Sequence, residues 1–299
     1  MVNFTSTDLI TICIPVYERF DYFEEAIDSA IAQTVKCPII VVDNASSHTK
    51  FKDYVKQKNT PFLKYHRNPE NLGMVNNWNK CLELSETQWV TLLHDDDVLD
   101  LRLIEFLVSK IELERESIAF AVRCATGPVC DPNNFFLESN KPSYILDKLF
   151  FMEGALPPAG LVFLRSVALD LNGFDPDDYP MHDFVFYYKL FLKGKIERFP
   201  DTLAFYRYST DQTSNAVAQE LIDKTYKYKI SLSNTWIERY LSHKAIVSAH
   251  KLYQDVFNID NLKLPFPYIK FRALKTQFIV YRWIRTKLMF VKNSFLKFN

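Results

Sequence analysis

Glycine is scarce in this chain, with only six among 299 residues. Phosphate-binding loops such as GxGxxG and GxxxxGK need several glycines close together, because their backbone approaches the phosphates directly. Neither pattern occurs in the sequence. The chain therefore does not bind a nucleotide in the manner of the dinucleotide-binding or P-loop proteins.

Signals for secretion, membrane insertion and structural disulfides are also missing. The five cysteines are odd in number and form no CxxC, which argues against a disulfide framework and favours a reducing cytoplasm. The N-terminus shows no basic segment followed by an apolar core, so we expect no signal peptide. No uncharged apolar run reaches about 18 residues, so we expect no membrane-spanning segment.

The chain carries no net charge, because its 36 Lys and Arg balance its 36 Asp and Glu. No overall field therefore points to nucleic acid as a partner. The basic residues are unevenly placed, however, since residues 263–299 contain nine of them and no acidic residue. This split predicts an acidic body with a basic attachment segment. The six histidines show no HxxxH or similar spacing, so we expect no zinc site.

Short apolar stretches alternate with amphipathic ones in the first hundred residues. Four of the apolar stretches are short and bounded by polar or turn-forming residues, which predicts buried strands at 9–17, 38–43, 62–67 and 89–93. The stretches between them predict helices. This alternation predicts an α/β fold with a mainly parallel sheet flanked by helices.

Carboxylates follow two of these predicted strands. Asp43 ends the second strand, and Asp95, Asp96 and Asp97 follow the fourth in "WVTLLHDDDVLD". Ligands of such sheets bind beyond the carboxyl ends of the strands, so both groups are expected on one rim. Three adjacent like charges repel one another, and a bound cation would stabilise them. The alternative is a strand that ends in a solvated acidic turn.

In order, the segments between residues 9 and 214 resemble the inverting family-two glycosyltransferases with a GT-A fold, of the type that builds bacterial surface polysaccharides. The matching segments are "TICIPVYERFDYFEEAIDSAIAQT", "IIVVDNAS", "NLGMVNNWN", "WVTLLHDDDVL", "LNGFD", "HDFVFYYKLFLKG" and "YRYSTDQTS". The resemblance implies transfer of a hexose or N-acetylhexosamine from a nucleotide sugar, UDP-linked, to a hydroxyl of a saccharide acceptor. It also implies Mn²⁺ or Mg²⁺ as the cofactor.

The resemblance assigns the acidic cluster to the metal and the nucleotide. A divalent ion stabilises the charge of a departing nucleoside diphosphate, and Mg²⁺ usually takes only one or two protein carboxylates. Asp96 is the first choice for direct metal contact and also lies beside the nucleotide. Asp97 is the second predicted metal ligand, and Asp95 is predicted near the ribose.

Further residues match positions around the family's nucleotide. Asp43 matches the contact to the base, since a carboxylate can accept a hydrogen bond from N3–H of uracil or thymine. Its alternative role is to cap the turn in "DNASS". The other predicted nucleotide-binding residues are Pro15, Tyr17, Glu18, Arg67, Asn79 and Arg207, of which the last three also have purely structural alternatives.

Inversion at the anomeric carbon requires a base that takes the acceptor's proton, and a carboxylate suits this task. In the family an acidic pair before a helix ending in Gly supplies it, and His182-Asp183 matches that pair. Asp183 is therefore the candidate catalytic base, with helix capping as its alternative. His182 replaces an acidic residue and is the candidate acceptor contact. In "YRYSTDQTS", Ser209 stands where the family often has His.

The predicted domain organisation follows from these segments. We expect a GT-A-like catalytic domain at residues 1–215, with a nucleotide-sugar half at 1–100 and an acceptor half at 101–215. A helical, basic and aromatic-rich region follows at 216–299. Such a helix can lie on an anionic membrane surface, which suits a polyprenyl-linked acceptor at the cytoplasmic face of the plasma membrane. Packing on the domain and homodimerisation are the alternatives.

Two rival functions are compatible with parts of this pattern. A non-catalytic scaffold would keep the GT-A-like fold and use its tail to dock a membrane-associated complex. A sugar-nucleotide pyrophosphorylase shares the style of fold, but it normally needs a Gly-rich nucleotide loop near the N-terminus, which this chain lacks.

Overall fold

The computed structural model describes residues 8–138, 141–208, 216–266 and 275. The chain divides into two compact units. Unit 1 comprises Met1–Asp147 and Ala155–Ser209, and unit 2 comprises Lys148–Gly154 and Thr210–Asn299. Each unit is described by itself below.

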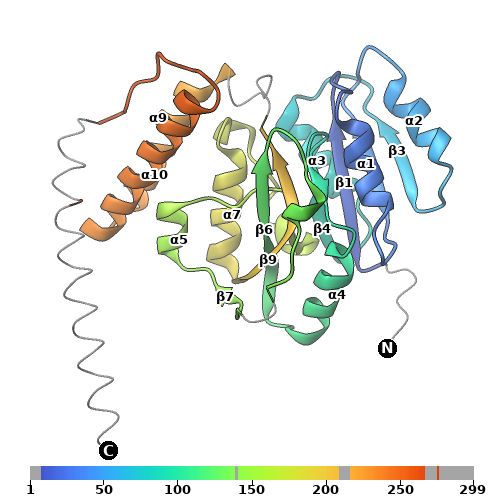
Figure 1. The fold of residues 1–299 in the computed structure, drawn as a ribbon, viewed down its shortest axis with the longest axis horizontal. Helices are drawn as coiled ribbons and strands as arrows, with labels where there is room; N and C mark the ends of the chain where they lie inside the picture. Colours follow the sequence, from blue (N-terminus) through green and yellow to red (C-terminus); the bar gives the residue numbers. More distant parts are fainter. Residues whose placement is uncertain (1–7, 139–140, 209–215, 267–274, 276–299) are drawn as a thin grey trace, which may run out of the picture. The chain divides into compact units, whose positions relative to one another are not determined.

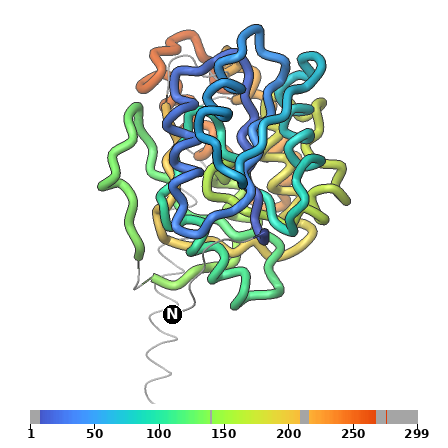
Figure 2. The backbone as a smooth tube through the Cα atoms, turned by 90° about the vertical axis from the view of Figure 1, so that its right-hand side faces the viewer, coloured from blue at the N-terminus to red at the C-terminus, as the bar shows by residue number. Residues whose placement is uncertain are grey.

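The first half of unit 1 alternates strands and helices as predicted. Its elements are β1 (Ile10–Val16), α1 (Phe23–Ile31), β2 (Ile39–Asp43), α2 (Lys50–Lys58), β3 (Leu63–Arg67), α3 (Met74–Leu84) and β4 (Trp89–Leu92). β1 pairs in parallel with β2 and β4, and β2 pairs in parallel with β3. Figure 2, viewed from the side of β3 and α2, shows this N-terminal part in blue nearest the viewer.

The second half of unit 1 makes the sheet mixed. Its elements are β5 (Val98–Leu99), α4 (Leu103–Leu113), β6 (Ser117–Gly127), η1 (Pro132–Asn134), β7 (Tyr144–Ile145), β8 (Leu161–Leu164), α6 (Arg165–Asp170), η2 (Pro176–Asp178), α7 (His182–Lys193) and β9 (Lys195–Arg207). The strand order is β3-β2-β1-β4-β8-β6-β9-β5, and β7 pairs with β9. Figure 1 shows β6 and β9 side by side. β8 runs antiparallel to β4 and β6, whereas β6 and β9 are parallel. The predicted α/β fold is confirmed, and its sheet is mixed, with parallel pairs among β1 to β4 and between β6 and β9.

Burial explains why the first strands are nearly continuous apolar runs. Every residue of β1 and β2 is buried, as in a sheet that is covered on both faces. Helix α1 contributes Phe23, Ala26, Ile27 and Ala30 to the core, which is one face of a helix with 3.6 residues per turn. Both strands are therefore enclosed along their whole length, and the loops that follow them form the rim.

Left-handed backbone occurs in both loops that follow β1 and β2. Glu18 has φ 57° and Ala45 has φ 62°, and neither residue is glycine. Non-glycine residues in this region carry a steric cost and concentrate at functional sites. The strain therefore directs attention to the rim where β1, β2 and β4 end.

Unit 2 is helical. Its described residues form α5 (Lys148–Glu153), α9 (Ala218–Leu232) and α10 (Trp236–Asp255), and α10 packs against both other helices. Helix α10 begins with a capping box, in which Thr235 and Glu238 satisfy each other's backbone N–H groups.

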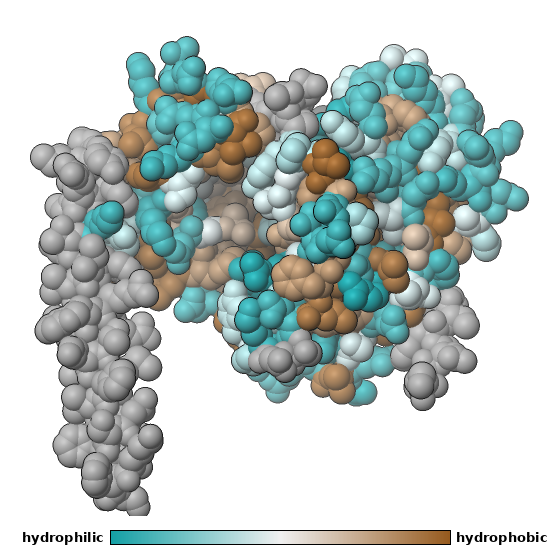
Figure 3. Space-filling model, viewed as in Figure 1, coloured by the Kyte–Doolittle hydropathy of each residue, from teal (hydrophilic) through white to brown (hydrophobic). Residues whose placement is uncertain are grey.

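The described part of the chain contains no helix that is both long and apolar enough to span a membrane. On the face shown in Figure 3, hydrophilic and hydrophobic residues are interspersed over unit 1. Most of the predicted membrane-attached tail, residues 267–274 and 276–299, lies outside the described residues, as do Ser209, Gln212 and Ser214. The attachment of the tail and the domain boundary at 215 stay predictions.

Candidate active site

The acidic cluster after β4 has a protein cation as its partner. Arg19 Nη2 lies 2.7 Å from Asp95 Oδ1 and 2.7 Å from Asp96 Oδ2. The side chains of the two aspartates are only 14% and 7% exposed. The cluster is therefore a buried, partly neutralised group rather than a solvated acidic turn.

Asp97 is the most deeply buried member of the cluster. Its side chain is fully buried, and its Oδ1 accepts a hydrogen bond from the backbone N–H of Arg207 at 3.0 Å. Within the described residues, its Oδ2 has no hydrogen-bond partner. Burial, with a contribution from Asp96, raises the pKa of Asp97 well above its usual value. A buried acceptor without a partner is costly, and a bound cation would satisfy it.

His94 adds a nitrogen to this group. Its Nδ1 lies 3.7 Å from Asp97 Oδ2, and its Nε2 has no hydrogen-bond partner in the described ranges. Burial lowers the pKa of His94 and so favours the neutral ring that can bind a metal. Ligand atoms of His94, Asp96 and Asp97 all lie within 4.8 Å of one another. These three residues fit a divalent cation.

His94 was not predicted as a metal ligand, because no second histidine stands at a ligand spacing from it. The available signal was its position directly before the three aspartates. Asp95, in contrast, is directed to Arg19, and burial raises the pKa of Asp95 to about 6. Asp95 shares Arg19 Nη2 with Asp96 but is not part of the group formed by His94, Asp96 and Asp97.

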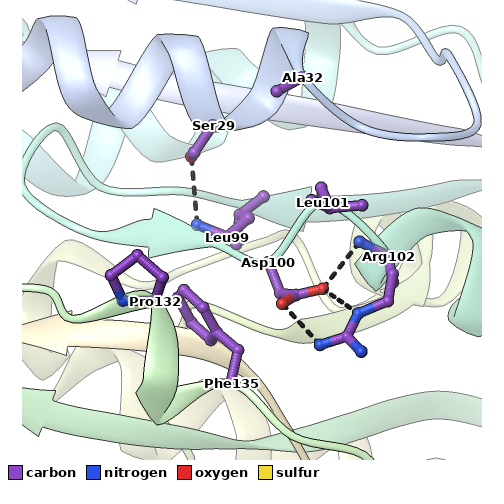
Figure 4. A pocket seen from close by; sticks show the side chains of 8 residues that line it. All are labelled: Ser29, Ala32, Leu99, Asp100, Leu101, Arg102, Pro132 and Phe135. Atoms are coloured by element: carbon purple, nitrogen blue, oxygen red, sulfur yellow. Dashed lines mark hydrogen bonds and ion pairs between the residues drawn. The ribbon is translucent and has the colours of Figure 1, made fainter.

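Asp100, which closes the same acidic stretch, has a structural role. Its carboxylate accepts hydrogen bonds from Arg102 Nε at 2.7 Å and Nη2 at 2.9 Å, just before α4 begins. Figure 4 shows this pair beside a surface pocket that Ser29, Leu99 and Phe135 also line. The three preceding aspartates do not line this pocket.

Asp43 at the end of β2 is completely buried and fully engaged. Its Oδ1 accepts from Ser46 N at 2.9 Å and Ser46 Oγ at 2.6 Å, and its Oδ2 accepts from Tyr65 OH at 2.6 Å and Arg67 Nη1 at 3.3 Å. A carboxylate has about four acceptor positions, so all of them are in use. A nucleobase would have to replace one of these donors.

The loop after β1 presents Tyr17 and holds Glu18. Pro15 is buried within β1, opposite Val42, whereas Tyr17 is 46% exposed at the rim. The Glu18 carboxylate accepts from Ser47 N at 2.7 Å and Ser47 Oγ at 2.8 Å, and these bonds lower the pKa of Glu18. Glu18 therefore ties the loops after β1 and β2 together.

Asn79 lies in a structural connection. Its side-chain amide donates to Phe174 O at 2.7 Å, and its Oδ1 accepts from Phe174 N at 2.8 Å. Both ends of the amide are thus used to join α3 to the turn before η2.

Arg207 at the end of β9 is 3% exposed and contacts the acidic loop after β4. Its Nε donates to the backbone oxygen of Asp96 at 2.8 Å, and its Nη2 lies 2.5 Å from Glu25 Oε2. The guanidinium also lies 4.5 Å from the ring centroid of Tyr22. Its contacts hold the backbone on which the candidate metal ligands are placed.

The candidate base lies at the start of α7, next to a pair of histidines. Asp183 is in the first helical turn, and its Oδ1 accepts from Phe184 N at 2.6 Å. The His182 ring is 4.7 Å from the Trp78 ring, which in turn is 4.8 Å from the His94 ring. Asp183 and Asp96 both counteract the effect of burial on the pKa of His94. The predicted base, acceptor contact and metal ligands are therefore brought together, while Asp43 with Arg67 forms a separate cluster.

The chain is similar in sequence to known proteins of one glycosyltransferase family. The sequence profile described as "Glycosyl transferase family 2" matches residues 11–169. The chain is 28% identical over 218 residues to an uncharacterized protein, MT1568, from Mycobacterium tuberculosis, which covers 67% of each chain. It is 27% identical over 187 residues to the abequosyltransferase RfbV from Salmonella typhimurium, which covers 57% of this chain and 55% of RfbV.

Two solved structures share the fold at low sequence identity. S. aureus TarS matches with a TM-score of 0.62 and 15% identity, over 86% of this chain and 76% of the other. The mannosyltransferase PcManGT from Pyrobaculum calidifontis, in complex with GDP-Man and Mn²⁺, matches with a TM-score of 0.57 and 16% identity, over 93% and 82%. TarS has also been solved in complex with UDP-GlcNAc. The GT-A-like fold is thereby confirmed.

Proposed function

The chain belongs to glycosyl transferase family 2, and we propose that it is a metal-dependent, inverting glycosyltransferase. It transfers a hexose or N-acetylhexosamine from a nucleotide sugar to a hydroxyl of a saccharide acceptor. The observation that carries this proposal is the group of His94, Asp96 and Asp97, in which the fully buried Asp97 Oδ2 has no hydrogen-bond partner among the described residues. This group lies in the same neighbourhood as the candidate base Asp183.

UDP is the proposed nucleotide of the donor. A TarS structure contains UDP-GlcNAc, whereas the PcManGT structure contains GDP-Man, so the shared fold accommodates both kinds of donor. Binding of uracil through Asp43 requires that Tyr65 or Arg67 give up its bond to that carboxylate. Arg67 is the weaker of the two partners, because its distance is 3.3 Å and its side chain is 41% exposed.

Mn²⁺ or Mg²⁺ is the proposed cofactor, held by Asp96 and Asp97 with His94 as a third ligand. When bound, such an ion would stabilise the charge of the departing nucleoside diphosphate. The chain's own contribution is to hold both buried residues in place. Arg207 Nε donates to the backbone oxygen of Asp96, and Arg207 N donates to the carboxylate of Asp97. Preorganised groups of this kind need little rearrangement during the reaction.

Asp183 is the proposed base. It lies in the first turn of α7, where its Oδ1 accepts a hydrogen bond from Phe184 N at 2.6 Å. The carboxylate would take the proton of the acceptor hydroxyl as the oxygen attacks the anomeric carbon. His182, buried against Trp78 with no hydrogen-bond partner on either ring nitrogen among the described residues, is the proposed acceptor contact.

The proposed setting is surface polysaccharide synthesis at the cytoplasmic face of the plasma membrane, on an acceptor linked to a polyprenyl lipid. The support for it is the basic, acid-free composition of residues 263–299. A homodimer formed through the aromatic side chains of that segment is the alternative use of the tail.

Replacement of Asp183 by Asn tests the enzymatic proposal. Release of the nucleotide from UDP-glucose, UDP-galactose and UDP-N-acetylglucosamine would be measured with Mn²⁺ and a saccharide acceptor. Asp183→Asn is expected to lower the rate by about 10²–10⁴-fold while nucleotide binding is retained. Asp170→Asn, an exposed aspartate at the end of α6, is the matched control. Equal, measurable rates in wild type and Asp183→Asn would contradict the role of Asp183 as the base, whereas no release by wild type would favour the scaffold.

A further inference from the structure

Arg19 is held in place by an unusual turn. Glu18, just before it, has a left-handed backbone, and Arg19 N donates to Tyr17 O at 2.6 Å. The Glu18 N–H donates to Ser46 Oγ at 3.0 Å, and Ser47 binds the Glu18 carboxylate. The loop after β2 therefore fixes the turn that directs Arg19 across the rim to β4.

The Arg19 guanidinium occupies a position between two carboxylates. A single nitrogen, Nη2, contacts both Asp95 and Asp96 at 2.7 Å. Both carboxylates raise the pKa of Arg19 above its usual value, so the side chain stays a cation. Asp96 also belongs to the candidate metal group with His94 and Asp97. Asp96 is thus shared between a resident cation and the proposed divalent one.

We propose that Arg19 is the resident counter-ion of the acidic rim, and that it exchanges partners during the binding of donor. Without metal and nucleotide it pairs with Asp95 and Asp96 and balances part of their negative charge. When a divalent cation binds Asp96, the two positive charges repel each other, and Arg19 turns to the diphosphate of the donor. A guanidinium is suited to this second partner, because its fork of N–H groups matches phosphate oxygens.

The exposure of the residues is consistent with such an exchange. The Arg19 side chain is 27% exposed, whereas Arg207, the other arginine at this rim, is 3% exposed and bound to Asp96 O, Pro128 O and Glu25. Arg19 can therefore move where Arg207 is enclosed. The partner exchange toward a diphosphate rests on the proposed function, whereas the counter-ion role does not.

The counter-ion role is tested with Mn²⁺ alone. Free Mn²⁺ is followed by electron paramagnetic resonance during titration of wild type, Arg19→Gln and Arg102→Gln, without nucleotide. Arg19→Gln is expected to bind Mn²⁺ at least about tenfold more tightly, since a competing positive charge is removed. Arg102→Gln breaks a comparable arginine–aspartate pair with Asp100 and is expected to match wild type. Equal or weaker binding by Arg19→Gln would overturn the counter-ion role.

The exchange is tested with inorganic pyrophosphate at saturating Mn²⁺, which represents the diphosphate without a base or sugar. Arg19→Gln is expected to bind pyrophosphate about tenfold more weakly than wild type. A damaged fold would weaken the binding of both ligands. Tighter binding of Mn²⁺ combined with weaker binding of pyrophosphate is therefore expected only from the proposed role of Arg19. Unchanged pyrophosphate affinity would overturn the exchange. Tighter Mn²⁺ binding in Arg19→Gln without nucleotide-sugar turnover in wild type would support the counter-ion role and contradict the proposed function.

Discussion

At the scale of single residues, burial of the acidic rim lowers the free energy of unfolding. Asp97 is buried with one carboxylate oxygen unpartnered in the described part of the chain, and Asp95 has its pKa raised by burial to about 6. Arg19 contacts Asp95 and Asp96 but not Asp97. Such an arrangement reduces stability in the absence of a ligand, and this cost is characteristic of a prepared binding site.

Substitution of Asp97 by Asn should therefore stabilise the metal-free protein. We expect the free energy of unfolding in EDTA to rise by about 1–3 kcal/mol, because a buried carboxylate with an unpartnered oxygen is replaced by a neutral amide. The measurement is urea denaturation. Asp100→Asn is the matched control and should lower the free energy of unfolding, because the Asp100 carboxylate accepts two hydrogen bonds from the Arg102 guanidinium. A loss of stability in Asp97→Asn as large as in Asp100→Asn would contradict this explanation.

The sequence predicted the carboxylates of the site better than their partners. The position of the aspartates after the fourth predicted strand placed them on the rim, but the roles of Asp96, Asp97 and Asp183 were implied by the family resemblance and stay predictions. The contact of Arg19 depends on left-handed backbone at Glu18, and no residue pattern indicates that conformation at a non-glycine position. Asn79 was predicted beside the nucleotide, but its hydrogen bonds to Phe174 depend on a tertiary contact that a sequence motif does not reveal.

At the scale of elements, Asn79 joins α3 to the turn that precedes η2. Gly173 in that turn has φ 68°, and a Cβ at this position would lie 2.3 Å from Asn79 Oδ1. The glycine is therefore required both by its backbone conformation and by the close approach of the amide.

Asn79→Ala should destabilise unit 1 without affecting ligand affinity. The backbone N–H and C=O of Phe174 would lose their partners, which costs about 1–3 kcal/mol. Asn76→Ala, on the exposed side of the same helix, is the control and should cost less than about 1 kcal/mol. Unfolding in urea and Mn²⁺–nucleotide binding would be measured for both variants. A selective loss of nucleotide affinity in Asn79→Ala would instead support the predicted role of Asn79 beside the nucleotide.

The elements from β1 to β4 were predictable because each of them is a local sequence pattern. β1 and β4 are apolar runs, and α1 has a clear apolar face. The position of β8 was not predictable in the same way. Hydrophobicity indicates that Leu161–Leu164 is buried, but not that it pairs antiparallel with β4 from far along the chain. Strand order in the second half is therefore a property of tertiary pairing.

At the scale of the whole molecule, the chain leaves unit 1 at residue 148 and returns at 155. Helix α5 belongs to unit 2, where Lys229 of α9 holds its C-terminal end. Lys229 Nζ donates to Phe151 O at 2.7 Å and to Gly154 O at 2.9 Å. No change of composition marks residues 148–154, so their membership of unit 2 was not predictable from the sequence.

Lys229 should make the stability of unit 2 depend on pH. Burial lowers the pKa of Lys229 to about 7, although Glu153 opposes this effect. In the unfolded chain the pKa returns toward 10.5, so between about pH 7 and 10 the unfolded state binds more protons. The contribution of Lys229 to stability is therefore lowest below about pH 7 and increases as the pH rises.

The test compares Lys229→Met with Lys224→Met, an exposed lysine on the same helix that pairs with Glu220. The free energy of unfolding of wild type minus that of Lys229→Met is expected to increase by about 2 kcal/mol between pH 7 and 9. The difference for Lys224→Met should stay within about 0.5 kcal/mol. A difference for Lys229→Met that is independent of pH would show that the lysine does not titrate in this range.

The measurement that tests the central claim most directly is a thermal-shift panel of UDP, dTDP, GDP and CMP, each with Mn²⁺ and with EDTA. A ligand at about 100 times its dissociation constant stabilises the folded state by about 2.7 kcal/mol, which is readily seen. We predict a shift with UDP that requires Mn²⁺ and is lost in Asp96→Ala. The absence of a shift with every nucleotide would contradict the account and leave the acidic rim without a donor to bind.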